Sequence, residues 1–211
     1  MASSARTRPA RPALSRAGIV ATALAVCTAD GIAAVTMRRV ARELDTAAAS
    51  LYVYVADRDE LVAAAHDLAV ADVELPTSAD GSWRDRLELL VERTAAALAA
   101  RGDIAVVGLT GTPGPAALRV IDEMVRLLRT AGLPALQCAW AVDLLGKHIA
   151  AAALEDRTGG APRVDDVESY PALAEIATVL TDGDPATRAA WKLGVLLDGL
   201  ERRASPQVRR G

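Results

Sequence analysis

The sequence predicts an all-α protein, on the basis of its composition and of the spacing of its apolar residues. The chain is rich in Ala and lacks Phe, with only three Trp and three Tyr among 211 residues. Apolar residues recur every three to four positions, as on amphipathic helices, and the strict alternation of strands is rare. The length suffices for one larger and one smaller domain with a sizeable core. We expect nine or ten helices.

The net charge of −3 is unevenly distributed. Residues 1–57 carry seven Arg and four acidic side chains, whereas residues 58–211 carry seventeen basic and twenty-three acidic ones. The amino-terminal module is therefore basic and the rest of the chain acidic. This asymmetry favours a DNA contact at one end of the molecule, although a few exposed arginines are also ordinary on other proteins.

The first helix is expected over residues 16–28. Ser15 precedes it as an N-cap, and Gly31 ends it because glycine adopts a positive φ at little cost. Residues 1–14 are rich in Pro, Arg, Ser and Ala, so they are expected to form a disordered basic arm. The arginines of this arm could follow a DNA backbone, but a solvated tail is the simpler interpretation.

Residues 36–61, TMRRVARELDTAAASLYVYVADRDEL, contain the most informative pattern. Thr36 can cap a short apolar-faced helix, which Asp45 interrupts. A second short helix is expected over residues 47–53, with Leu51 turned inward. Two short helices around a tight turn are how a helix-turn-helix reader of the DNA major groove is built. The same periodicity also occurs in all-helical proteins that do not bind DNA.

Outward side chains of this motif are the candidates for DNA contact. Arg38 is suited to bidentate recognition of guanine. Ala48 and Ala49 would touch thymine methyl groups without hydrogen bonds, so sequence choice would also depend on DNA shape. Tyr52 either contacts a phosphate or packs between helices. The predicted set, with Arg58 on a phosphate, is Thr36, Arg38, Ala48, Ala49, Ser50, Tyr52, Tyr54 and Arg58.

Asp57 is expected to cap the next helix, over residues 58–73, with Glu60 as the second half of a capping box. Residues 76–82 form a linker. Further helices or short apolar segments are expected over 83–100, 103–109, 115–131, 134–157, 170–180 and 184–203, with a flexible loop at 158–168.

The residues give no constellation typical of an enzyme. There is no nucleophile beside a base, no metal-ligand spacing and no glycine-rich phosphate loop. His66 and His148 are the only histidines; we interpret both as structural, and Trp140 as a core residue. Cys27 and Cys138 are expected to be reduced, buried thiols of a cytoplasmic protein. No stretch reaches the roughly 18–20 apolar residues of a membrane helix.

Residues 15–62 resemble the TetR family of bacterial transcription regulators. Two positions depart from the family pattern: Asp45 replaces a glycine in the turn, and Ala47 replaces the Ser or Thr that opens the second helix. A helix cap is therefore expected to be missing. The residues that carry the resemblance are Asp30-Gly31, Thr36, Arg38, Val40-Ala41, Leu44, Leu51-Tyr52, Tyr54-Val55 and Arg58 through Leu61.

From residues 80–83 (DGSW) to 154–156 (LED) the chain is similar to the tetracycline repressor, whose carboxyl domain binds ligand and dimerises. The histidine that holds magnesium there matches Gly108, and polar drug contacts match Leu90 and Met124, so magnesium-tetracycline binding is not expected. The resemblance implies an uncharged, largely apolar effector instead. The implied pocket positions are Leu90, Thr94, Gly108, Met124, Val142 and Glu155.

We therefore expect a homodimeric repressor that an effector releases from a palindromic DNA operator, with no cofactor, metal or membrane partner. Residues 15–62 would bind DNA, and residues 63–211 would bind effector and dimerise. Helices 135–157 and 186–203 would pair with their mates across a two-fold axis. The alternative is a helical small-molecule carrier without DNA function, which would leave the basic module unexplained.

Overall fold

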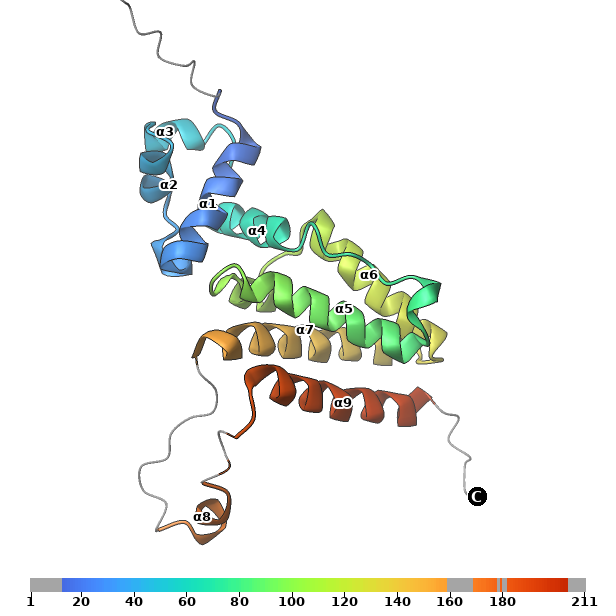
Figure 1. Ribbon diagram of the computed structural model, residues 1–211. Coiled ribbons are helices and arrows are strands. Elements are labelled where there is room, and N and C mark those ends of the chain that lie inside the picture. The colour runs from blue at the N-terminus through green and yellow to red at the C-terminus, as the bar shows by residue number, and fades with distance from the viewer. Residues whose placement is uncertain (1–12, 159–168, 178, 180–181, 205–211) are drawn as a thin grey trace, which may run out of the picture.

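The computed structural model describes residues 13–158, 169–177, 179 and 182–204. Within these residues the protein has nine α-helices, three short 3-10 helices and no strand, so the all-α prediction is confirmed. Figure 1 shows a small helical head joined to a larger helical body. Residues 1–12 of the expected arm and residues 159–168 of the expected loop lie outside the described residues.

The head begins with helices whose ends follow from local sequence. The side chains of Ser15 and Thr36 accept backbone N–H groups in the first turns of two helices, as predicted. Gly31 ends the first helix with a φ of 83°. Leu51 is fully buried in the core beneath these helices. The elements are α1 (Arg16–Asp30), η1 (Ile32–Ala34), α2 (Met37–Glu43) and α3 (Ala48–Leu51).

A single helix, α4 (Arg58–Ala69), leads from the head into the body (Figure 1). It packs on α1 at one end and on η3 (Ile104–Leu109) and α6 (Pro115–Thr130) at the other. In the body α5 (Trp83–Ala99) packs on α7 (Ala135–Thr158), and α9 (Pro185–Ala204) runs along another side of α7. The short elements η2 (Ser78–Asp80) and α8 (Pro171–Ala177) complete the fold, and α8 lies apart from the other helices in both views.

Three predicted helices are longer than the observed ones, and one of these, predicted over 170–180, is α8, which ends at Ala177. The helix predicted over 58–73 ends at Ala69, although Val70 and Val73 are buried. Buried apolar residues continue beyond the end of the helix, because the chain turns after Ala69 and continues along the core. Arg119 of α6 donates there to the carbonyl oxygens of residues 71 and 73, at 3.0 and 2.8 Å. The helix predicted over 47–53 is also shorter, since α3 passes into a turn after Leu51.

Two side-chain predictions need correction. Asp57 caps α4 by accepting the N–H of Glu60 at 2.8 Å, but Glu60 does not reach back to Asp57. Instead its Oε2 accepts the N–H of Ala56 at 2.6 Å, one residue earlier. The core position predicted for Trp140 is wrong, because this residue is 63% exposed on α7. Cys27 and Cys138 are buried free thiols, as predicted.

Candidate nucleic-acid interface and ligand cavity

The turn between α2 and α3 is closed by the backbone. The N–H of Thr46 donates to the carbonyl of Ala41 at 2.9 Å. Asp45 has a φ of 50°, the only positive value among the described non-glycine residues. Ala47 occupies the N-cap position of α3 without a side-chain hydrogen bond, which confirms that a cap is missing. Position 45 of the turn therefore has a positive φ, which favours glycine, although this chain has an aspartate there.

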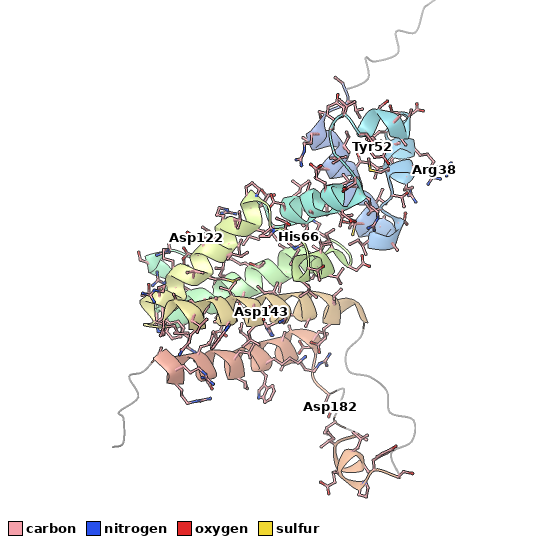
Figure 2. The ribbon with its side chains drawn as sticks, turned by 180° about the vertical axis from the view of Figure 1, so that it is seen from behind. Arg38, Tyr52, His66, Asp122, Asp143 and Asp182 are labelled. Atoms are coloured by element: carbon pink, nitrogen blue, oxygen red, sulfur yellow. The ribbon has the colours of Figure 1, made fainter. Side chains whose placement is uncertain are left out.

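Arg38 lies on the exposed face of α2 and lines a shallow hollow together with Ala47 and Ala48. Figure 2 shows Arg38 at the outer edge of the head, on the side away from the body. It has no hydrogen-bond or ion-pair partner among the described residues. Arg42, one helical turn further along α2, lines the same hollow. Sequence reasoning missed Arg42, although its spacing of four from Arg38 indicates the same face.

The exposed part of α3 continues this surface. Tyr52 is 55% exposed at the end of the helix, and Ala49 is exposed. Ala48 and Ser50 are partly buried. Small side chains beside exposed arginines allow a nucleic-acid backbone or base edge to approach closely, because little volume intervenes.

Two other predicted DNA contacts have partners within the chain. The hydroxyl of Tyr54 donates to the carbonyl of Leu14 at 3.0 Å. Arg58 donates from Nε to the carbonyl of Val35 at 2.7 Å and from Nη2 to that of Ile32 at 2.9 Å. Arg58 thereby holds the segment around η1 against the start of α4. A phosphate contact by either residue stays a prediction.

The head also contacts the body directly, at the residues that precede η3. Asp103 Oδ1 accepts the N–H of Ile32 at 2.6 Å and lies 3.7 Å from Cys27 Sγ. Gly102 has a φ of 78°, and a Cβ there would lie 2.5 Å from the carbonyl oxygen of Cys27. The close approach therefore requires glycine at position 102, and the end of α1 rests on residues 102 and 103.

Two consecutive side chains attach α4 to the body. Asp67 Oδ1 accepts the N–H of Ala117 at 2.9 Å, in the first turn of α6. The N-cap of α6 is Gly114, which has no side chain, so Asp67 supplies the cap from another helix. His66 packs on Gly108 of η3, where an added Cβ would lie 2.9 Å from His66 Nε2. A movement of η3 or α6 would thus be transmitted to α4.

A cavity of about 210 Å³ lies between α4, η3 and helices α5, α6 and α7. Its wall is mostly apolar and includes Val70, Leu98, Ala105, Val120 and Ile149. Of the predicted pocket positions, Thr94, Gly108, Met124 and Val142 line this cavity, whereas Leu90 and Glu155 do not. Sequence reasoning did not include His66, which also lines it.

The cavity contains few polar groups. Thr94 donates its hydroxyl to the carbonyl of Leu90 at 2.7 Å. At one edge Lys147 Nζ binds Asp143 Oδ2 at 2.6 Å, and both side chains are more than half exposed. Burial lowers the pKa of His66, against a smaller opposing effect of Asp67. The imidazole is therefore neutral at neutral pH.

Glu155 joins α7 to α9. It binds Arg188 Nε at 3.0 Å and Lys192 Nζ at 2.6 Å, and its side chain is 14% exposed. The hydrogen bond from Lys192, together with Arg188, keeps the pKa of Glu155 below its ordinary value. The carboxylate is thus engaged within its own chain, outside the cavity.

The outer sides of α7 and α9 carry large exposed apolar side chains. Leu136, Trp140 and Leu144 follow one another at intervals of four along α7, and Trp191 and Val195 do the same on α9. Their exposed fractions range from 41% to 71%. Solvation of so many large apolar side chains on adjacent helices is unusual for a monomer.

Two features are absent from the part of the chain that the structure describes. No group of three or more His, Cys, Asp or Glu side chains is placed to hold a metal ion. No described helix combines the length and apolar composition needed to cross a membrane.

Two family models together match most of the chain. Residues 19–65 match bacterial regulatory proteins of the tetR family, and residues 75–204 match the tetracyclin repressor-like C-terminal domain. The chain belongs to the TetR family. TetR-family proteins are transcription regulators, so the head, with its helix-turn-helix, is the DNA-binding part of this protein.

Individual TetR-family proteins are similar over nearly the whole chain. The transcriptional repressor DrrR1 of Streptomyces coeruleorubidus is 28% identical, over 92% of this chain and 80% of the relative. Apo ActR of Streptomyces coelicolor is 31% identical with a TM-score of 0.78, over 91% of this chain and 98% of that one. ActR in complex with actinorhodin is 30% identical with a TM-score of 0.77, over 91% and 99%.

Proposed function

We propose that this TetR-family protein is a homodimeric repressor that a small, largely apolar effector releases from DNA. The observation that carries the proposal is the path from cavity to head: one short helix, α4, forms part of the cavity wall and contacts η1 and α1 at its other end. DrrR1 is named as a repressor, and ActR has been solved in complex with actinorhodin. Residues 15–62 would bind DNA, and residues 63–211 would bind effector and dimerise.

On the DNA side, α3 enters the major groove while Arg38 of α2 reads a base edge. Arg42 joins it as a phosphate contact, since it is exposed beside the same hollow. Two heads of a dimer reach successive major grooves about 34–36 Å apart, which predicts a near-palindromic operator. A protein acting on chromosomal DNA would work in the cytoplasm.

The dimer forms through α7 and α9. Trp140 and Trp191 are the largest exposed apolar side chains on these helices, and a second copy would cover them in a four-helix interface. This pairing also explains why a residue with the pattern of a core tryptophan is solvent-exposed in the single chain.

Effector binding must favour a dimer whose heads no longer fit the operator, because a ligand with equal affinity for both states shifts nothing. A ligand in the cavity contacts α4, η3 and α6 at once, and Asp67 and Asp103 connect these elements to each other and to the head. A coupling free energy of about 1–3 kcal/mol would weaken operator binding about 5- to 150-fold.

A gel-shift titration tests the proposal. Purified protein is mixed with DNA flanking its own gene, with excess competitor DNA and at two salt concentrations. We expect nanomolar, competitor-resistant binding that weakens as salt rises, since phosphate contacts release counterions. Weak binding that competitor DNA abolishes, here and in a selection from genomic fragments, would instead favour a small-molecule carrier.

A further inference from the structure

His66 is placed where the cavity meets the helix that leads to DNA. It lies on α4 (Figure 2). Its ring lines the cavity and packs on Gly108 of η3. Gly108 does not have the positive φ that requires glycine. Its missing side chain instead provides room for the imidazole, because a Cβ at this position would lie 2.9 Å from Nε2.

Among the polar side chains that line the cavity, only the imidazole has no hydrogen-bond or ion-pair partner within the described residues. Thr94 has already donated its hydroxyl hydrogen to Leu90, and Lys147 pairs with Asp143. His66 has no hydrogen-bond partner among the described residues. Neither of its ring nitrogens is a fully buried atom that lacks a partner, so both can be reached. A neutral imidazole offers one N–H donor and one nitrogen acceptor.

We propose that His66 is the polar anchor for the effector, and that the effector is a compact ring compound whose hydroxyl group hydrogen-bonds the imidazole. This inference rests on the proposed function, in which the cavity binds the effector. A hydroxyl group matches the imidazole because it can both donate and accept, whereas most of the surrounding wall offers apolar contact to the rings. The volume of about 210 Å³ favours a compact molecule, since sites for drug-sized ligands span about 300–1,000 Å³.

The position of His66 gives the hydrogen bond a mechanical consequence. The next residue, Asp67, caps α6, and the His66 ring contacts η3. A ligand bound to His66 would therefore act where α4, α6 and η3 meet. Val70, the C-cap of α4, also lines the cavity, but it offers only apolar contact. The hydroxyl group would therefore contribute to release from DNA as well as to affinity.

The test compares 2-naphthol with 2-methylnaphthalene, which replaces the hydroxyl by a methyl group of similar size. Binding is measured by equilibrium dialysis, without DNA, for the wild type, His66→Leu and His66→Gln. We expect the affinity ratio of 2-naphthol to 2-methylnaphthalene to be about 3- to 10-fold higher in the wild type than in His66→Leu, as for one net hydrogen bond. His66→Gln keeps hydrogen-bonding groups and should retain part of the preference.

His148→Gln is the matched control, because His148 is a half-buried histidine that does not line the cavity. It should keep the wild-type ratio. In wild-type protein, 2-naphthol should shift the imidazole ¹⁵N signals of His66 but not those of His148. Gly108→Ala should lower the affinity for 2-naphthol, because the new methyl group displaces the ring.

Equal ratios in the wild type and His66→Leu, or no binding of either compound up to its solubility limit, would overturn the inference. These measurements contain no DNA, so they remain decisive whether or not the gel shift succeeds. A wild type that binds its operator tightly but shows no preference for 2-naphthol would refute the anchor while leaving the repressor function intact.

Discussion

Asp103 accepts a hydrogen bond from the backbone N–H of Ile32 at 2.6 Å, across 71 residues of sequence. Arg58 binds the carbonyl oxygen of the same Ile32 at 2.9 Å. Both backbone groups of one residue at the start of η1 are thus held, one by the body and one by α4. The head is fixed to the rest of the protein at this point, so its orientation depends on η3 as well as on α4.

We predict that Asp103→Ala lowers the free energy of unfolding by about 1–3 kcal/mol, because it leaves a partly buried N–H without a partner. It should also reduce the effector-induced loss of operator affinity, since η3 no longer holds the head. Thermal melts and gel shifts with and without effector measure the two effects. Asp72→Ala is the control, because Asp72 is exposed and has no interaction partner among the described residues. Identical behaviour of the two variants would contradict the prediction.

Arg38 and Arg58 should respond differently to replacement by Ala. Arg38 is exposed and unpaired among the described residues, so Arg38→Ala should leave the melting temperature unchanged. It should remove about 1–3 kcal/mol of discrimination at one base pair, the value of a bidentate contact. Binding to a panel of operators with single substitutions measures this loss. Unchanged base preference would show that α2 does not read the operator as proposed.

Arg58→Ala should lower stability, because the carbonyl oxygens of Ile32 and Val35 lose their donors. If Arg58 also contacts phosphate, the variant should weaken all DNA sequences alike and reduce the salt dependence of binding. Melting curves and titrations at two salt concentrations separate the two roles. A variant with wild-type stability would show that its hydrogen bonds to the segment around η1 contribute little.

The contrast between these arginines shows what sequence alone could predict. The caps at Ser15, Thr36 and Asp57 were predictable because each involves groups within three residues. The partners of Arg58 lie 23 and 26 residues away and are brought to it only by the tertiary fold. The sequence therefore predicted a contact between Arg58 and a DNA phosphate but gave no indication of its hydrogen bonds within the chain.

The ligand site was predictable only in part, because contacts between residues distant in sequence were again not foreseen. Thr94, Gly108, Met124 and Val142 line the cavity, as the family resemblance implies. Glu155 does not, because Arg188 and Lys192 hold it from α9, more than 30 residues away. Trp140 was misplaced because helical periodicity gives the apolar face of a helix without stating whether the same chain or a second copy covers it.

The missing cap at Ala47 can be supplied. Its backbone already has the extended N-cap conformation, with φ −79° and ψ 141°. Ala47→Ser should therefore raise stability by about 0.5–2 kcal/mol, since its hydroxyl can accept an N–H of α3. Ala49→Ser places the same residue on the exposed face of α3 and should instead be neutral or slightly destabilising. Melting temperatures test this, and equal shifts for both variants would show that capping is not responsible.

Trp140→Glu should disrupt the proposed dimer. A charge buried without a partner costs about 3–5 kcal/mol, which corresponds to at least about a hundredfold weaker association. Sedimentation velocity should show a monomer at concentrations where the wild type is a dimer. Leu118→Glu is the control, because Leu118 is similarly exposed but lies on α6, which is not part of the proposed interface. A dimeric Trp140→Glu variant would place the interface elsewhere.

Stability should fall as the solution is acidified below neutral pH. Burial lowers the pKa of both His66 and His148, with Lys192 lowering that of His148 further. The nearby carboxylates of Asp67 and Glu155 oppose these shifts but are outweighed. Each histidine thus binds a proton more readily in the unfolded chain than in the folded protein.

A folded-state pKa below the unfolded value of about 6.5 means that this stability is fully present above pH 6.5 and is lost as the pH falls through the folded pKa. For His66 the slope cannot exceed about 1.4 kcal/mol per pH unit, the value for one proton. Melting temperatures between pH 7.5 and 5.5 should therefore fall less steeply for His66→Leu than for the wild type. The comparison cancels the contributions of carboxylates, which both proteins share. Parallel curves would show that His66 has the same proton affinity in both states, contrary to its burial in the cavity wall.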